Sequence, residues 1–392
     1  MQNHWFLLGA VLLLGAIDVT SSYNVWKLAR ANGNFAFCLY DHVIDGHDGE
    51  NKLFSPFSLS TALAMTYAGA KGETAAQMSE VLGFSHLTFN VHAVFLATLG
   101  SKDFTLALAN GIFLDTGFSI CPSFPELLAK YYIASAKRLP FHNDPTASAD
   151  SINDWVKYQT SNMIQKIVTP NDVADAEFAL MNAVYFGGVW KCPFDEDDTR
   201  LATFDVSPLE SVTVNMMVQT ARLRFSYNRR LRSRILELPY EGDRLSMYII
   251  LPTRKNGLAA LERKLSFTTV TSALANLRRR RVSIAIPRFK MSVDENLPEI
   301  LSDMGMNLAF TPAADFSGIA SGVYITKVIH AAFIGVDEKG TEAAAATAVT
   351  GGYESAPHLR GNFVADHPFL FLIRDSRTGS ILFLGRLVRP QQ

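Results

Sequence analysis

The chain has 392 residues, of which 48% are hydrophobic and 19% are charged. This composition is typical of a globular protein and excludes the disordered, collagen-like and disulfide-dense classes. Its 36 lysine and arginine residues balance 37 acidic residues, so no overall positive field holds a nucleic acid, and we expect none as the main partner. No linker or internal repeat divides the chain, which favours one large domain over two.

The first 22 residues have the pattern of a cleaved secretory signal peptide. Residues 6–17 form an uninterrupted apolar run, shorter than the roughly 20 residues of a membrane-spanning helix, and small polar residues follow at 20–22. The competing interpretation is a buried first helix. We expect residues 1–22 to be removed, leaving a secreted, extracellular domain over residues 23–392 with no membrane partner. Cys38, Cys121 and Cys192 are an odd set, so at most one internal disulfide is expected.

Helical patterns come first along the chain and strand patterns come later. Residues 59–67 and 74–82 carry apolar side chains at helical spacing. From about residue 178 the pattern changes to short β-rich runs, each followed by a proline, at residues 235–238, 245–251 and 282–286. This order predicts an α+β domain.

Residues 338–348 (EKGTEAAAATA) fit neither pattern. Their five alanines have high helix propensity, whereas residues 349–357 contain the glycines and the proline of an exposed loop. Composition alone therefore favours a surface helix followed by a loop.

Several ordered stretches are spread from about residue 35 to residue 390. They are residues 51–65 (NKLFSPFSLSTALAM), 180–190 (LMNAVYFGGVW), 237–252 (ELPYEGDRLSMYIILP), 287–291 (PRFKM), 304–310 (MGMNLAF), 315–319 (DFSGI), 365–371 and 381–386. Together these stretches resemble the serpin family. The tail ADHPFLFLIRD is similar to arthropod serpins, especially tick salivary ones, which implies a role against host proteases of haemostasis or immunity. The resemblance implies an α+β fold with about nine helices, three β-sheets and an exposed reactive loop at about residues 338–357.

A serpin of the inhibitory type is a suicide substrate of serine proteases and not an enzyme. The resemblance implies that the protease is held as an acyl-enzyme when the cut loop inserts into the large sheet as a new strand. No catalytic residue, metal or cofactor is required, and the sequence lacks a G-x-S-x-G motif, zinc-ligand cysteine spacing and a phosphate-binding glycine loop. We expect a monomer. The rival hypothesis is a non-inhibitory serpin that acts as a carrier or interaction protein.

The residues before the expected cut are suited to insertion. In a strand, alternate side chains share a face, and residues 341, 343, 345, 347, 349 and 351 are all small or uncharged, so their burial leaves no unpaired charge. Gly340 is expected where the loop bends into the sheet. This pattern favours the inhibitor over the carrier. The family's hinge corresponds to Glu338, Gly340, Thr341, Glu342, Ala343, Ala344, Ala345, Ala346 and Thr347.

Family spacing places the reactive bond fourteen residues after Gly340, between Glu354 and Ser355. Glutamate is unusual there and implies an acid-tolerant protease. Tyr353 is the alternative and implies a chymotrypsin-like target, whereas a cut after Arg360 would place a proline in the inserted strand.

Two further groups of residues are identified by their positions in the family motifs. The sequence departs from the family pattern at Gly187, Ala331, Gly335 and Lys339. It therefore does not predict which residues form the salt bridges at the top of the large sheet. The family's shutter and breach, which control opening of the sheet, correspond to Ser55, Pro56, Ser58, Asn182, His330 and Trp190.

Two arginine runs are candidate sites for weak binding of a sulfated glycosaminoglycan. Neither lies near residues 86–102, which correspond to the heparin-binding helix of the best-known serpins. Because the net charge is nearly zero, ordinary solvated charge runs are the simpler interpretation. The first run is Arg278, Arg279, Arg280 and Arg281, and the second is Arg229, Arg230, Arg232 and Arg234.

Overall fold

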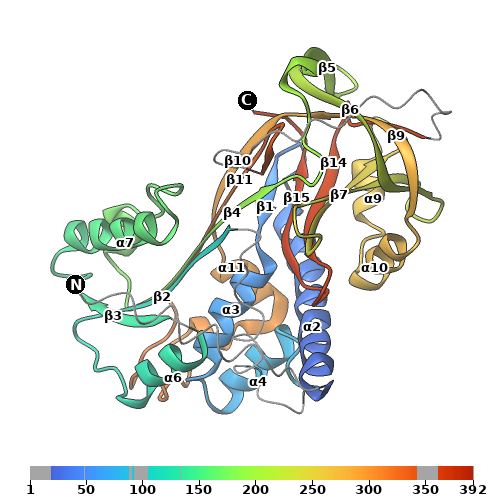
Figure 1. The fold of residues 1–392 in the computed structure, drawn as a ribbon. Helices are drawn as coiled ribbons and strands as arrows, with labels where there is room; N and C mark the ends of the chain where they lie inside the picture. Colours follow the sequence, from blue (N-terminus) through green and yellow to red (C-terminus); the bar gives the residue numbers. More distant parts are fainter. Residues whose placement is uncertain are drawn as a thin grey trace, which may run out of the picture.

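A computed structural model describes residues 19–47, 49–87, 91, 105–132, 134–341 and 361–391. These residues contain nine α-helices (Figure 1). None of the helices described is both long and apolar enough to cross a membrane. The helices are α2 (Val19–Ile44), α3 (Pro56–Tyr67), α4 (Gly72–Val81), α6 (Ser123–Tyr132), α7 (Pro145–Gln159), α8 (Pro170–Val173), α9 (Leu258–Glu262), α10 (Phe267–Ala275) and α11 (Pro298–Leu301).

The two predicted early helices are confirmed as α3 and α4. Helix α3 begins after Ser55, whose hydroxyl accepts a hydrogen bond from the Ser58 amide, and Pro56 occupies the first turn, where a missing N–H costs nothing. Nearly all of α3 is buried, which places it in the centre of the molecule. The predicted leader lies largely outside the described residues. Helix α2 begins at Val19, within that leader, and the cleavage site stays a prediction.

One sheet has six strands, and its middle strands carry the site described below. Strand β4 pairs in parallel with β11 over part of its length and antiparallel with the short β12 at its end. In spatial order the strands are β10 (Phe289–Asn296), β11 (Lys327–Val336), β12 (Gly340–Thr341), β4 (Phe178–Val189), β2 (Thr105–Asp115) and β3 (Ser135–Leu139).

A second, nine-stranded sheet contains the strands predicted at residues 235–238, 245–251 and 282–286. The 19-residue strand β6 pairs with β5 near its start and with β7 near its end, and β9 lies beside it. These long strands thus join two of the three expected sheets into one. The order is β1 (Lys52–Phe54), β15 (Ile381–Leu387), β14 (Phe369–Asp375), β8 (Leu245–Pro252), β7 (Ser233–Pro239), β6 (Glu210–Asn228), β9 (Arg278–Pro287) and β13 (Gly361–Val364), with β5 (Arg200–Ser207) on β6.

The central strand β4 of the six-stranded sheet is buried on both faces, by different partners. Along β4, Ala179, Met181 and Ala183 belong to a small core that includes residues of α7, which lies against β2 (Figure 1). Leu180 and Val184 point the other way, into the main core that includes α3. Side chains at even-numbered positions of β4 therefore face α3, which decides where the polar residues of this strand point.

Candidate functional site

The predicted hinge begins as a strand that separates two others. Gly340 and Thr341 form β12, in which Gly340 pairs with Val189 and Thr341 pairs with Gly188 of β4 and Val336 of β11. Beyond this end, β4 and β11 pair directly with each other over seven positions, from Phe333–Tyr185 to Lys327–Ala179. The sheet is therefore parted at one end by the hinge and closed along the rest of these strands.

Thr341 faces the core, as the alternation predicts. Its side chain is fully buried, and its hydroxyl lies 2.7 Å from the hydroxyl of Tyr240. The Tyr240 ring in turn stacks on Trp190, with ring centroids 4.5 Å apart. Burial raises the pKa of the Tyr240 phenol, so it remains a neutral hydrogen-bonding group.

Gly340 is required for a different reason from the expected bend. The backbone φ angle of Gly340 is not positive. A Cβ at this position would lie 2.0 Å from the Gly188 carbonyl oxygen and 2.9 Å from the Val189 Cα. The backbone of β4 thus excludes any side chain at residue 340, and close strand packing replaces conformational freedom as the explanation.

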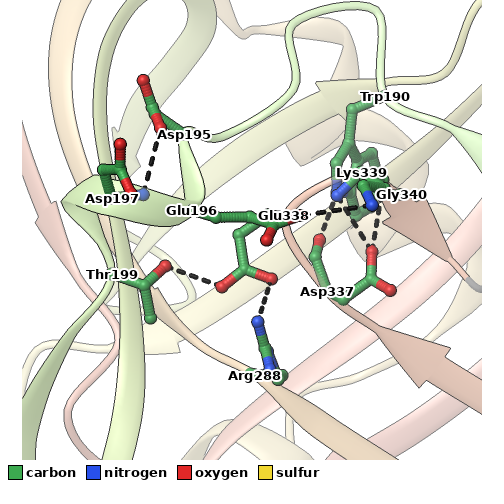
Figure 2. A network of polar contacts seen from close by, with 10 residues as sticks. All are labelled: Trp190, Asp195, Glu196, Asp197, Thr199, Arg288, Asp337, Glu338, Lys339 and Gly340. Atoms are coloured by element: carbon green, nitrogen blue, oxygen red, sulfur yellow. Dashed lines mark hydrogen bonds and ion pairs between the residues drawn. The ribbon is translucent and has the colours of Figure 1, made fainter. Parts of the chain in front are cut away.

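The turn before the hinge is fixed by a polar network (Figure 2). The Asp337 carboxylate accepts hydrogen bonds from the amides of Lys339 and Gly340 at 2.9 and 3.0 Å, and its backbone carbonyl accepts one from the Trp190 indole at 2.9 Å. Trp190 therefore joins the end of β4 to the turn that delivers the hinge.

Glu338 points away from this turn toward Thr199 and Arg288, as Figure 2 shows. The carboxylate is almost completely buried, accepts a 2.6 Å hydrogen bond from the Thr199 hydroxyl and is paired with the Arg288 guanidinium. Burial alone would raise the pKa of Glu338, but the hydrogen bonds from Thr199 and Arg288 lower it below its ordinary value. The sequence did not predict which salt bridge forms at this end of the sheet, and the structure shows that it is Arg288–Glu338. Lys339 has a separate exposed partner, Glu196, at 3.2 Å.

A second polar cluster crosses the closed part of the sheet. Asn110 of β2, Asn182 of β4 and His330 of β11 are adjacent in register and point toward α3. The Asn182 amide donates to the Ser58 hydroxyl at 2.6 Å and to the Asn110 side-chain oxygen, and the Asn182 oxygen contacts the His330 Nδ1. One row of side chains thus links three strands to one helix.

The hydrogen bonds of His330 define its protonation. Its Nε2 accepts a 3.0 Å hydrogen bond from the Ser55 amide, so Nδ1 carries the proton and donates to Asn182. The ring is fully buried, and this burial lowers its pKa from 6.5 to about 3. His330 is therefore a neutral structural group at physiological pH.

A family model described as "Serpin (serine protease inhibitor)" matches residues 30–390. The chain belongs to the serpin family. Members of this family are generally protease inhibitors, and the predicted α+β serpin fold is confirmed by solved structures.

Three similar proteins illustrate the range of serpins. Intracellular coagulation inhibitor 1 of Tachypleus tridentatus is 34% identical, over 96% of this chain and 90% of its own. The structure of Serpin48, described as a highly specific serpin of the insect Tenebrio molitor, matches with a TM-score of 0.84 and 30% identity, over 96% of this chain and all of that one. Human thyroxine-binding globulin, solved in complex with thyroxine, matches with a TM-score of 0.85 and 26% identity, over 94% of this chain and 100% of that one.

The structure brings most of the predicted shutter residues of this serpin together. Ser55, Ser58, Asn182 and His330 are in mutual contact, and Pro56 lies in the first turn of α3 beside them. Trp190 lies apart from them, at the end of β4 with the start of the hinge. Outside the described residues lie Glu342, Ala343, Ala344, Ala345, Ala346, Thr347, Tyr353, Glu354, Ser355 and Arg360.

Sequence reasoning missed several residues of these networks, including Asp337, which holds the turn before the hinge. Asn110 could have been identified from the sequence, because it is a polar residue at a core-facing position of an otherwise apolar strand. Tyr240 and Arg288 lie in or beside stretches that resemble the family, but nothing in the sequence pairs them with Thr341 or Glu338. Thr199 has no sequence signal at all, since only the fold brings it to Glu338.

Proposed function

We propose that this serpin is a secreted, irreversible inhibitor of serine proteases that traps its target by inserting the reactive loop between β4 and β11. One observation carries the proposal: β12 already occupies the start of that position, with the Thr341 side chain turned into the core. Secretion rests on the predicted leader, residues 1–22.

Insertion has a defined route. The new strand would continue from Thr341 and separate the seven direct pairs of β4 and β11, gaining hydrogen bonds on both edges. Residues 343, 345, 347, 349 and 351 would then follow Thr341 on the core face, and none of them is charged or large. The strand hydrogen bonds and the added burial supply the driving force.

The trapped protease is inactivated by displacement. In the proposed reaction its nucleophile forms an ester with the carbonyl carbon at the cut, and the peptide bond after that carbonyl breaks. Insertion then carries the attached protease along the sheet and distorts its active site. Loss of oxyanion-hole donors slows hydrolysis of the ester by about 100- to 1000-fold.

The two polar clusters have separate proposed roles. The shutter row of Asn110, Asn182 and His330 holds β2, β4 and β11 together until insertion parts β4 from β11. The turn around Asp337 and Glu338 fixes the place where the strand enters. Substitutions in either cluster would change stability and trapping efficiency, and not the choice of protease.

The proposed reactive bond is Glu354–Ser355, with Tyr353–Glu354 as the alternative. The first implies a protease that accepts an acidic residue, and the second a chymotrypsin-like one. A target among host proteases of haemostasis or immunity rests on the resemblance to tick salivary serpins.

The test is incubation of the mature protein with trypsin-like, chymotrypsin-like, elastase-like and glutamate-cleaving proteases. We expect a covalent complex that survives denaturing electrophoresis with at least one of them. N-terminal sequencing of the released peptide identifies the bond: a start at Ser355 assigns Glu354, and a start at Glu354 assigns Tyr353.

The Thr341→Arg variant tests the insertion step separately. It would bring a charge into the buried site beside Tyr240, so we expect normal cleavage of the loop without a stable complex. Thr341→Ser retains the hydroxyl and is the matched control. If every protease cuts the wild-type loop without forming a complex, the carrier or interaction function is favoured, for which the thyroxine-bound neighbour provides a precedent.

A further inference from the structure

Helix α2 presents one continuous face to solvent. Its exposed residues recur every three or four positions, which is the spacing of a single helical face. The other side of the helix packs into the main core, to which Val25 and Leu28 belong. The residues of the exposed face are Tyr23, Trp26, Arg30, Asn34, Cys38 and Asp41.

The first two turns of this face combine aromatic rings with positive charge. Tyr23 and Trp26 are 57% and 50% exposed, which is unusual for large apolar side chains in a folded domain. The Lys27 Nζ lies 4.5 Å from the centre of the Tyr23 ring, and the Arg30 guanidinium carbon lies 5.8 Å from the centre of the Trp26 ring. Each ring therefore has a cation beside it. Tyr23, Trp26, Lys27 and Arg30 are called the aromatic–basic patch below.

No carboxylate compensates the charge of the aromatic–basic patch. Among the residues that the structure describes, neither Lys27 nor Arg30 forms an ion pair with an acidic side chain. The next residue on the exposed face, Asn34, is neutral, and Asp41 lies about 16 Å from Arg30 along the helix axis. Removal of the predicted leader would add an α-amino group at residue 23, which is positive at neutral pH. The patch thus attracts anions.

The exposed rings distinguish a lipid surface from other anionic partners. Tryptophan and tyrosine are enriched where lipid headgroups meet acyl chains, because their rings have an apolar body and a polar end. Lysine and arginine near an anionic membrane each strengthen binding about fivefold. Single-stranded nucleic acid also stacks on aromatic rings, but it binds along a charged groove, whereas this patch covers the convex surface of a helix. A soluble polyanion would use the cations without the rings.

We infer that the aromatic–basic patch binds the surface of an anionic phospholipid membrane, with the two rings among the headgroups and the two cations beside their phosphates. The contact is peripheral, so it requires no membrane-spanning helix. It replaces the expectation, drawn from the sequence, that the mature domain has no membrane partner.

The position of α2 suits such a contact. In Figure 1, α2 lies in the lower half of the view, whereas β5 lies at the top. The hinge turn is beside the start of β5, because Thr199 binds Glu338 there. Attachment through α2 therefore leaves the hinge end of the molecule away from the lipid surface, and lipid binding can be measured without a protease.

The experiment is sedimentation of the protein with lipid vesicles. It uses the mature chain, residues 23–392, because the apolar residues 6–17 would enter lipid by themselves. Phosphatidylcholine vesicles with about 30% phosphatidylserine are compared with vesicles of phosphatidylcholine alone. We expect binding to the anionic vesicles to be at least about tenfold tighter and to weaken as salt is added.

Two variants separate the charges from the ring. On anionic vesicles we expect Lys27→Gln/Arg30→Gln to bind about 30-fold more weakly than wild type, and Trp26→Ala about tenfold more weakly. The matched control, Arg229→Gln/Arg230→Gln, removes the same charge from the exposed turn after β6, and we expect it to bind as wild type. All variants should unfold at the temperature of wild type, which separates lost binding from lost folding.

Tryptophan fluorescence reports the contact directly. Of Trp26, Trp155 and Trp190 in the mature chain, Trp26 is the exposed one. We expect a blue shift of the emission when anionic vesicles are added, and no shift in Trp26→Phe. The inference is overturned by no binding to anionic vesicles or equal binding to both kinds, and by equal losses in the two double variants. It is also overturned by wild-type binding of Trp26→Ala, or by single-stranded DNA that binds as tightly as the vesicles.

Discussion

His330 illustrates how one side chain couples a strand to a helix. Its Nε2 accepts the amide proton of Ser55 immediately before α3, and its Nδ1 contacts Asn182 on the neighbouring strand. Protonation would convert Nε2 into a donor facing another donor. The contact therefore exists only in the neutral form of the ring.

This requirement predicts a stability change with pH. The pKa of His330 is about 3 in the folded protein and 6.5 as its ordinary value. Above pH 6.5 the contribution is fully present. As pH falls from 6.5 toward 3, the unfolded chain binds a proton that the folded protein does not, so stability falls by about 1.4 kcal/mol per pH unit.

Urea unfolding at pH 7 and pH 5 measures this contribution. We expect wild type to lose about 2 kcal/mol from this group between the two values. His330→Gln should show a smaller difference between the two pH values. An identical difference in both proteins would contradict the neutral assignment.

Gly340 provides a second prediction at the level of a single residue. In Gly340→Ala the new Cβ would meet the Gly188 carbonyl oxygen at 2.0 Å, so we expect residues 340 and 341 to leave their place between β4 and β11. Hydrogen exchange should then be faster at the amides of β12. Gly117→Ala is the control, because the nearest atom to its Cβ is a side-chain oxygen at 3.2 Å. Unchanged exchange in Gly340→Ala would contradict the close packing.

Among the elements, the row across β2, β4 and β11 predicts unequal effects of similar substitutions. Asn182 contacts Ser58, Asn110 and His330, whereas Asn110 contacts only Asn182 in the described network. We expect Asn110→Ala to lower the free energy of unfolding by about 1–2 kcal/mol and Asn182→Ala by about 3 kcal/mol or more, because the latter leaves several buried groups unpaired. Thermal or denaturant unfolding of the two variants measures the difference, and equal losses would argue against Asn182 as the centre of the row.

The sequence predicted elements better than it predicted their partners. Proline-bounded apolar runs located β7, β8 and β9, and helical spacing located α3 and α4. Residues 338–348 have helix-forming alanines, yet Gly340 and Thr341 are in a strand because hydrogen-bonding edges are available on both sides. Local propensity could not indicate this, since the edges belong to strands from distant parts of the chain.

The same reason limits prediction of the site. Resemblance to the family located Ser58, Asn182 and His330, and the structure shows that they touch. The contacts of Tyr240 with Thr341 and of Thr199 with Glu338 join residues about 100 or more positions apart, and no periodicity encodes them.

At the scale of the whole molecule, a sheet parted at one end predicts a gain in stability after cleavage. When the loop is cut, the proposed insertion extends the two-residue β12 into a full strand of the six-stranded sheet, so we expect a markedly higher unfolding temperature for nicked than for intact protein. Differential scanning calorimetry of both forms measures it. Nicked Thr341→Arg is the control and should gain little. If nicked wild type unfolds at the same temperature as intact protein, the loop does not insert.

The position of the shutter row sets the timing of the proposed reaction. Counted from the hinge, the Asn182–His330 pair is the fourth of the seven pairs that join β4 directly to β11. Strand separation that starts at β12 therefore meets its strongest polar resistance halfway. In the proposed reaction, hydrolysis of the ester before β4 and β11 have separated would release an active protease. The efficiency of the proposed trapping therefore depends on whether the strands separate at Asn182 and His330 before the ester is hydrolysed.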